Sequence, residues 1–209
     1  MEKFLTDQAQ EIFEFISDFK EIKNFTFVGG SALAYYLNHR LSEDLDFFTW
    51  EKEISLNFIE ELKRYFSNKY EIKILNQTIT KIDLNINNTK ITFFANNWEK
   101  LKERDLLINN LYIAKKEILT AMKVNALSMR AKFRDYYDLF VISKELYNIQ
   151  DIYDICLKNL PGINKKIFST QLCFTNDIDD DNINNLSPKY NINKKEIRVY
   201  FERLINVFI

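Results

Sequence analysis

The spacing of hydrophobic residues predicts two kinds of structure along the chain. Up to about residue 95, helical spacing alternates with the two-residue period that is typical of strands. Asn87-Asn88 separates two runs of the second kind and predicts a tight hairpin turn. This order of elements predicts a mixed sheet with helices packed on one side, an α+β fold. The expected helices are 6–20, 32–37 and 56–66, and the expected strands are 25–28, 44–48, 70–75, 79–86 and 90–94.

From about Lys116 the spacing becomes helical and stays so to residue 208. The polar, acidic run 176–185 interrupts it and is expected to be a loop. A front half of strands and helices and an all-helical rear half predict two domains, 1–115 and 116–209, that share a cleft. The expected helices of the rear half are 116–129, 135–144, 152–160, 165–174 and 193–208.

Composition and charge exclude several classes of protein and of metal site. The 209 residues, 46% of them hydrophobic, can bury a sizeable core. Lys and Arg number 29 against 30 Asp and Glu, so any nucleic-acid contact needs a local basic patch. One histidine, His39, and two cysteines, Cys156 and Cys173, without CxxC spacing argue against a zinc site. Because no apolar run is long enough for a membrane span or signal peptide, we expect a cytoplasmic protein without membrane contact.

The first candidate site is the stretch from Gly29 to Asp46. Gly29-Gly30 follows an apolar run, and Ser31 can start the next helix, so this helix amino terminus is a candidate phosphate site. In a strand, Asp44 and Asp46 share one face with their carboxylates about 7 Å apart, which suits a magnesium ion. Taken alone, the glycines also fit a tight turn and the aspartates a solvated strand face. Their combination favours a functional site.

The second candidate site lies in the predicted helical half. Lys123 and Arg130 fall on a common stripe of one helix, and Arg134 precedes two further carboxylates, Asp135 and Asp138. Such cations bind triphosphate oxygens and stabilise a leaving pyrophosphate, and an aspartate can accept a proton from an attacking hydroxyl. The plainer alternatives are an exposed helix lysine and aspartates that cap a helix or form salt bridges.

Both candidate sites belong to four short blocks of sequence: Gly29-Gly30-Ser31, Arg40-x-Ser42-x-Asp44-Leu45-Asp46-Phe47, Ala121-Met122-Lys123 and Lys132-x-Arg134-Asp135-x-x-Asp138-Leu139. In order and spacing, these blocks resemble the AbiEii/AbiGii toxin family over roughly residues 25–145. Members of that family are nucleotidyltransferases with a DNA polymerase β-like fold, and several are the toxins of bacterial toxin–antitoxin or phage-defence systems.

The resemblance implies a polymerase β-like nucleotidyltransferase domain over 1–115 and a helical bundle over 116–209. It implies a nucleoside triphosphate substrate, Mg²⁺ or Mn²⁺, an acceptor that can be a transfer RNA or another RNA, and a cognate antitoxin as partner. By position, the implied phosphate-binding residues are Gly29, Gly30, Ser31, Arg40, Ser42, Lys123, Arg130 and Arg134. The implied catalytic residues are Asp44, Asp46, Lys123, Asp135 and Asp138, with Asp44 and Asp46 as metal ligands.

One position departs from the polymerase β-like pattern. Many such enzymes place a third carboxylate on a neighbouring strand, but the expected strand 90–94 contains no acid. Asp83, on the strand before, is the nearest candidate for a third metal ligand, and without it the site holds one tightly bound metal. An alternative is therefore a catalytically degenerate module that binds nucleotide or protein, and a further one is metal-dependent phosphate-ester hydrolysis.

Overall fold

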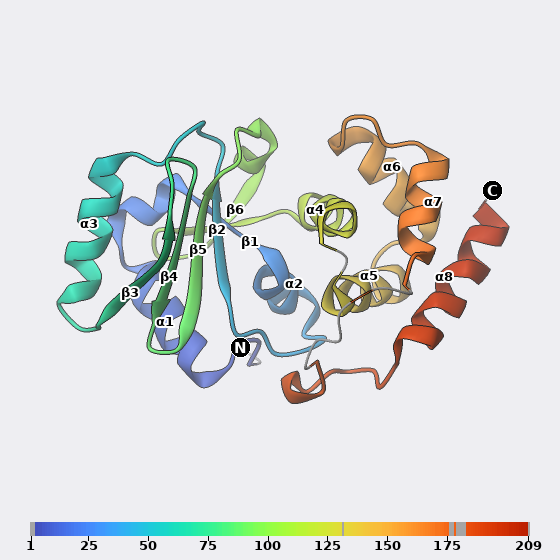
Figure 1. The fold of residues 1–209 in the computed structure, drawn as a ribbon, viewed down its shortest axis with the longest axis horizontal. Helices are drawn as coiled ribbons and strands as arrows, with labels where there is room; N and C mark the ends of the chain where they lie inside the picture. Colours follow the sequence, from blue (N-terminus) through green and yellow to red (C-terminus); the bar gives the residue numbers. More distant parts are fainter. Residues whose placement is uncertain (1–2, 131, 176–177, 179–182, 209) are drawn as a thin grey trace. The chain divides into compact units, whose positions relative to one another are not determined.

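The computed structural model describes residues 3–130, 132–175, 178 and 183–208, and divides the chain into two compact units. The first unit comprises residues 1–115 and contains the sheet, and the second comprises residues 116–209 and is helical (Figure 1). Within the described ranges, no helix has the length and apolar character needed to cross a membrane.

The first unit is built on a seven-stranded mixed sheet with the strand order β3-β4-β5-β2-β1-β7-β6. β2 lies between β1, which runs antiparallel to it, and β5, which runs parallel to it. The strand that carries Asp46 therefore lies in the interior of the sheet. The strands are β1 (Thr26–Val28), β2 (Leu45–Thr49), β3 (Ile72–Gln77), β4 (Lys81–Ile86), β5 (Thr89–Ala95), β6 (Arg104–Ile108) and β7 (Leu111–Ala114).

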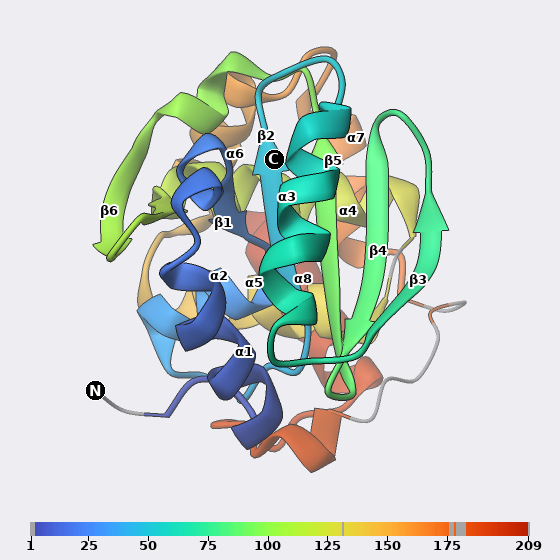
Figure 2. The same ribbon diagram turned by 90° about the vertical axis from the view of Figure 1, so that its left-hand side faces the viewer.

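One face of this sheet is apolar and is covered by α1 (Asp7–Ser17) and α3 (Leu56–Ser67) (Figure 2). Phe27, Phe47 and Phe93 are paired in register across β1, β2 and β5, so their rings lie on the same face and are fully buried. α1 contributes Phe13, whose ring lies 5.3 Å from that of Phe27, and α3 contributes Phe58, 5.2 Å from Phe93. Since strand side chains alternate between faces, Asp46 must lie on the opposite face.

α2 (Gly29–Leu37) follows β1 without a connecting loop. The sequence predicted that Ser31 starts this helix, but the helix begins two residues earlier, at Gly29. Gly29 has φ +77°, a left-handed conformation that glycine adopts readily, and this allows the chain to turn directly from strand into helix. The first backbone N–H groups of α2 therefore lie at the end of β1, next to β2.

The sheet contains the predicted hairpin between β4 and β5 and an unpredicted one between β6 and β7. Asn87 and Asn88 both have positive φ, 51° and 60°, as expected for the tight turn between β4 and β5. No strand was predicted between 95 and 115, yet β6 and β7 pair antiparallel around Asn109-Asn110. β7 also pairs parallel with β1, so this hairpin extends the sheet on that side and β6 forms its edge.

The second unit is a bundle of helices arranged around α4. α4 packs against α5, α6 and α7, and α8 packs against the last three helices as well. All five correspond to predicted helices. Most of the run 176–185, which was expected to be a loop, lies outside the described residues. The helices are α4 (Lys116–Met129), α5 (Phe133–Glu145), α6 (Ile149–Asn159), α7 (Lys165–Cys173) and α8 (Lys194–Phe208).

Candidate functional site

The carboxylate of Asp46 packs directly against Gly29. A Cβ atom built on Gly29 would lie 3.1 Å from the carboxyl carbon of Asp46 and closer still to one of its oxygens. Only a residue without a side chain allows this approach. The structure thus places a half-buried carboxylate next to the amino terminus of a nine-residue helix, a position where backbone N–H groups bind anions.

A buried hydroxyl pair connects the start of α2 to the segment before β2. The Ser31 and Ser42 hydroxyl oxygens lie 2.7 Å apart, and the Ser31 hydroxyl also donates a hydrogen bond to the backbone carbonyl of Asp44. Arg40 is 4% exposed and donates from Nη1 to the carbonyl oxygen of Leu41 at 3.0 Å. The two Ser31 contacts hold the 42–44 segment against α2, while the Arg40 bond lies within the segment before β2.

The sheet register places a residue that the sequence analysis missed beside Asp46. Asp46 pairs with Thr92 on β5, and Thr92 pairs with Asp83 on β4, so all three side chains lie in one row on the same face. Thr92 therefore occupies the neighbouring-strand position at which a third carboxylate was expected. The register of β2 against β5 would have identified it, but parallel pairing between strands distant in sequence leaves no local signal.

Asp83 faces the same side as Asp46, but it has its own partners. Its Oδ1 accepts a hydrogen bond from the Thr92 hydroxyl at 2.9 Å, and its Oδ2 lies 2.7 Å from Nζ of Lys81. Burial raises the pKa of the Asp83 carboxyl, but the hydrogen bonds from Lys81 and Thr92 outweigh this, and the pKa lies below its usual value. Among the described residues, no three His, Cys, Asp or Glu side chains gather closely enough to hold a metal ion.

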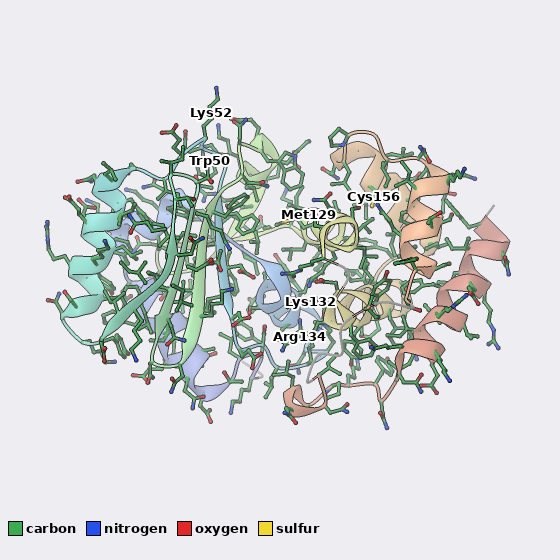
Figure 3. The ribbon with its side chains drawn as sticks, in the orientation of Figure 1. Trp50, Lys52, Met129, Lys132, Arg134 and Cys156 are labelled. Carbon is green, nitrogen blue, oxygen red and sulfur yellow. The ribbon has the colours of Figure 1, made fainter. Side chains whose placement is uncertain are left out.

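In the second unit, Lys123 lies between the two aspartates that the sequence placed near it. Its Nζ is 2.8 Å from Oδ1 of Asp135 and 2.6 Å from Oδ2 of Asp138, and all three side chains are at most 7% exposed. Arg130 adds a two-pronged contact to Asp135, with Nε and Nη2 at 3.0 and 3.2 Å from the two oxygens. Arg134 is half-buried at the beginning of α5, where Figure 3 shows it near Lys132.

This cluster keeps Asp135 ionised although its side chain is buried. Burial raises the pKa of Asp135, but the charges of Lys123 and Arg130 outweigh that effect and hold the pKa below its usual value. An ionised carboxylate with 1% exposure is stable only when it is paired in this way. Tyr136 and Tyr137, next to it, are fully buried core residues.

Comparisons with known proteins agree on the fold. Residues 12–109 match the model of a family described as nucleotidyl transferase AbiEii toxin of a type IV toxin–antitoxin system. The matched segment includes Gly29 to Asp46, Asp83 and Thr92, and it ends before Lys123. A protein of Aquifex aeolicus, described as uncharacterized, is 23% identical over 210 residues, with 98% of each chain covered.

Two solved structures share the architecture of nearly the whole chain. MenT4, a nucleotidyltransferase toxin from Mycobacterium tuberculosis, superposes with a TM-score of 0.59 at 13% identity and covers 95% of this chain and 85% of its own. JHP933 from Helicobacter pylori superposes with a TM-score of 0.57 at 20% identity, with 97% and 92% covered. These likenesses establish the fold, which is the expected α+β class. The match to the AbiEii nucleotidyltransferase toxin family model covers the segment that builds the Gly29–Asp46 site, and this is the family that the motifs of the chain resemble.

Proposed function

We propose that this protein transfers a nucleoside monophosphate from a nucleoside triphosphate to an acceptor hydroxyl and releases pyrophosphate. The observation that carries the proposal is the contact between Asp46 and Gly29, because it places a carboxylate beside the anion-binding end of α2. In the reaction, the acceptor oxygen forms a bond to the α-phosphorus and the bond to the bridging oxygen breaks. Pyrophosphate leaves with the electron pair, and the acceptor proton passes to a carboxylate.

The backbone of α2 supplies the phosphate contacts in this proposal. The first N–H groups of a helix have no partner within the helix, and those of Gly30 and Ser31 belong to this group. Because the Ser31 hydroxyl is buried against Ser42 and Asp44, we assign it the task of positioning Asp44. Arg40 and Ser42 stabilise the segment before β2 through the hydrogen bonds described above. Their predicted phosphate contacts stay predictions.

Asp44 and Asp46 fit a divalent ion of the magnesium type. Mg²⁺, or Mn²⁺, is usually held by one or two carboxylates together with substrate phosphates, so two aspartates beside a phosphate site form a suitable donor set. When bound, such an ion neutralises the charge that develops on the phosphates. Asp83 contributes at most indirectly, because Lys81 and Thr92 already engage its two oxygens.

In the second unit, the observed ion pairs support a positioning role for Asp135 and Asp138. Both carboxylates hold Lys123, and Asp135 also holds Arg130. The phosphate contacts expected for Lys123, Arg130 and Arg134 stay predictions. Since Lys123 is balanced by two carboxylates, a Lys123→Met change should unfold the bundle partly as well as lower activity.

The match to the family model also supports a biological setting for the proposed activity. A toxin that transfers nucleotides in the cytoplasm would act on an RNA acceptor, such as a transfer RNA, and would be controlled by a cognate antitoxin. The match of residues 12–109 to the AbiEii toxin family model supports this assignment.

The test is a transfer assay with Mg²⁺, each labelled nucleoside triphosphate in turn, and total RNA. Wild type should transfer label to RNA, and Asp46→Asn should lower the rate by at least 100-fold, or about 2.7 kcal/mol. Asp105→Asn is the control, because Asp105 is exposed on β6 and the change is chemically the same. Equal rates for Asp46→Asn and the control would refute the site.

The presence of Thr92 beside Asp46 favours one alternative, a module that binds nucleotide without transferring it. In the same assay, this alternative predicts binding of labelled triphosphate by wild type with no labelled product. Release of free phosphate or nucleotide without transfer would instead indicate hydrolysis.

A further inference from the structure

The sheet face that carries Asp46 extends over β5, β4 and β3 as three rows of side chains. Cross-strand partners point to the same face, so the register, which shifts in β3 between Ile74 and Asn76, assigns the residues of each row. The middle row contains the site residues, and the two outer rows flank it on either side. The rows are Phe48–Phe94–Lys81, Asp46–Thr92–Asp83–Asn76 and Lys90–Asn85–Lys73.

This face is polar and positively charged away from Asp46, in contrast to the opposite face. Lys73, Asn76 and Lys90 are exposed, and the two lysines flank Asn85 at about 10 Å from each other, the distance of two strand spacings. Lys81 is close enough to Asp83 for an ion pair. The core is on the other side, where α1 and α3 cover the phenylalanines, so folding does not require cations here.

Two aromatic rings lie on the same face, next to the row of Asp46. The rings of Phe48 and Phe94 are 5.1 Å apart in an edge-to-face arrangement, and both residues are half-buried. Lys81 is the next residue in their row. Lysines combined with half-buried aromatic rings on a sheet are the elements with which proteins bind single-stranded RNA, through phosphate contacts and base stacking.

We propose that this face, made of the three rows, binds the acceptor as single-stranded RNA and brings its terminal hydroxyl beside Asp46. Lys73 and Lys90 contact phosphates of the strand, and a base stacks on Phe94. The proposal rests on the proposed function, because it assigns the acceptor of the same reaction. It also gives Asp83 a role: the Thr92 hydroxyl donates to its carboxylate, and the carboxylate in turn fixes the ammonium group of Lys81 on β4, the central strand of this face.

The test compares a double charge reversal on this face with a matched one elsewhere. Lys73→Glu/Lys90→Glu changes two cations on the proposed face, and Lys63→Glu/Arg64→Glu changes two cations on α3, which covers the opposite face. A fluorescent single-stranded oligoribonucleotide is titrated with each protein over a range of salt concentrations. We expect the first variant to bind at least tenfold more weakly and to lose about 1.4 from the salt slope, since each phosphate contact contributes about 0.7.

Stacking and catalysis are tested separately. Phe94→Leu keeps an apolar side chain and should weaken oligoribonucleotide binding about tenfold, because stacking on an aromatic ring is lost. In the transfer assay, the charge reversal should raise KM for RNA and leave KM for the triphosphate unchanged. Circular dichroism and thermal unfolding of all variants show whether each is folded.

The outcomes distinguish this inference from the function on which it rests. Absence of any transfer by wild type contradicts the proposed function, whatever the oligoribonucleotide titrations show. Transfer to RNA that the two charge reversals affect equally overturns the acceptor face alone. Label recovered on protein instead of RNA also overturns it, because the acceptor would then belong to another class.

Discussion

A side chain at position 29 has no room, because the Asp46 carboxylate occupies the space where its Cβ atom would lie. Gly29→Ala should therefore cost about 1–2 kcal/mol for the left-handed backbone and roughly 1–3 kcal/mol for the clash. Urea unfolding measures the sum, and the transfer assay should show a loss of activity because Asp46 is displaced.

Gly162 provides the control for this substitution. It has the same φ of +77°, but no atom lies within 4 Å of a Cβ built on it. Gly162→Ala should thus cost only the backbone contribution. Adding Asp46→Ala to Gly29→Ala should bring its cost down to that of Gly162→Ala. A Gly29→Ala protein as stable as Gly162→Ala would contradict the observed fit.

Asp135 makes the stability of the protein depend on pH in acid. Its pKa is lowered in the folded state, so its ion pairs stabilise fully above the unfolded pKa of about 3.9 and are lost as the pH falls through the lower folded value. At neutral pH, Asp135→Asn should lower the free energy of unfolding by about 3–5 kcal/mol, because Lys123 keeps a buried charge with one partner fewer.

The measurement is urea unfolding of wild type and Asp135→Asn at several pH values between about 3 and 7. Wild type should lose more stability on acidification than the variant, so the two curves converge at low pH. Asp154→Asn, an exposed position on α6, should stay within about 0.5 kcal/mol of wild type. Parallel curves for wild type and Asp135→Asn would show that the pairs do not determine the acid sensitivity.

At the level of elements, the register of β2, β5 and β4 determines how many carboxylates the site can present. Thr92→Asp would place a third one between Asp46 and Asp83. Without divalent ions, repulsion should destabilise the protein by about 0.5–3 kcal/mol. Mg²⁺ or Mn²⁺ at 100 times its Kd should restore about 2.7 kcal/mol, a larger gain than in wild type.

Thermal unfolding in chelator and in Mg²⁺ or Mn²⁺ gives both quantities. Thr92→Asn, which has nearly the same size as the aspartate variant and no charge, separates the effect of charge from the loss of the hydrogen bond to Asp83. If the metal stabilises Thr92→Asp no more than wild type, then position 92 does not face the metal site.

The sequence was sufficient to predict elements whose apolar residues repeat with a strong period. It was also sufficient to predict motifs whose residues lie close together in the chain. The five α-helices described in the second unit and five strands were predicted, because their apolar residues repeat regularly along the sequence. β6 and β7 were missed since they are only 5 and 4 residues long and neither shows the alternation of apolar and polar residues that predicted β3 and β4. Their turn, Asn109-Asn110, repeats the signal of Asn87-Asn88 and could have revealed them.

The site was predictable to the extent that its residues are neighbours in sequence. Spacing identified Gly29 to Asp46 and Lys123 with its two aspartates as candidates. The role of Thr92 could not be predicted, because it depends on the pairing of β2 with a strand more than 40 residues later. The same holds for Ser31, since its hydroxyl contacts residues 11 and 13 positions away.

At the level of the whole molecule, each unit contains a core of its own. In the second unit, Tyr153, Phe168 and Phe208 are joined by ring contacts of 5.2–5.8 Å, and Phe140 contacts Tyr200 at 4.8 Å. The fragment 116–209 should therefore fold alone into a helical bundle. Its urea unfolding, followed by circular dichroism, should be a single sigmoidal transition.

The variant Phe168→Ala tests whether the fragment 116–209 folds around a specifically packed core. Removing this fully buried ring should cost about 3–5 kcal/mol and shift the transition to lower urea. A gradual loss of helix without a transition, in fragment and variant alike, would mean that the second unit needs the first for its folding.

The fit between Gly29 and Asp46 also constrains how the sequence can diverge. While Asp46 is required, selection must keep glycine at 29, because any side chain there would displace the carboxylate. In a lineage that gave up transfer and kept only the fold, Asp46 could shrink, and position 29 would then be free to drift toward asparagine or another residue that tolerates positive φ. Loss of glycine at this position in a descendant would therefore record the loss of the carboxylate, and with it the end of selection for catalysis.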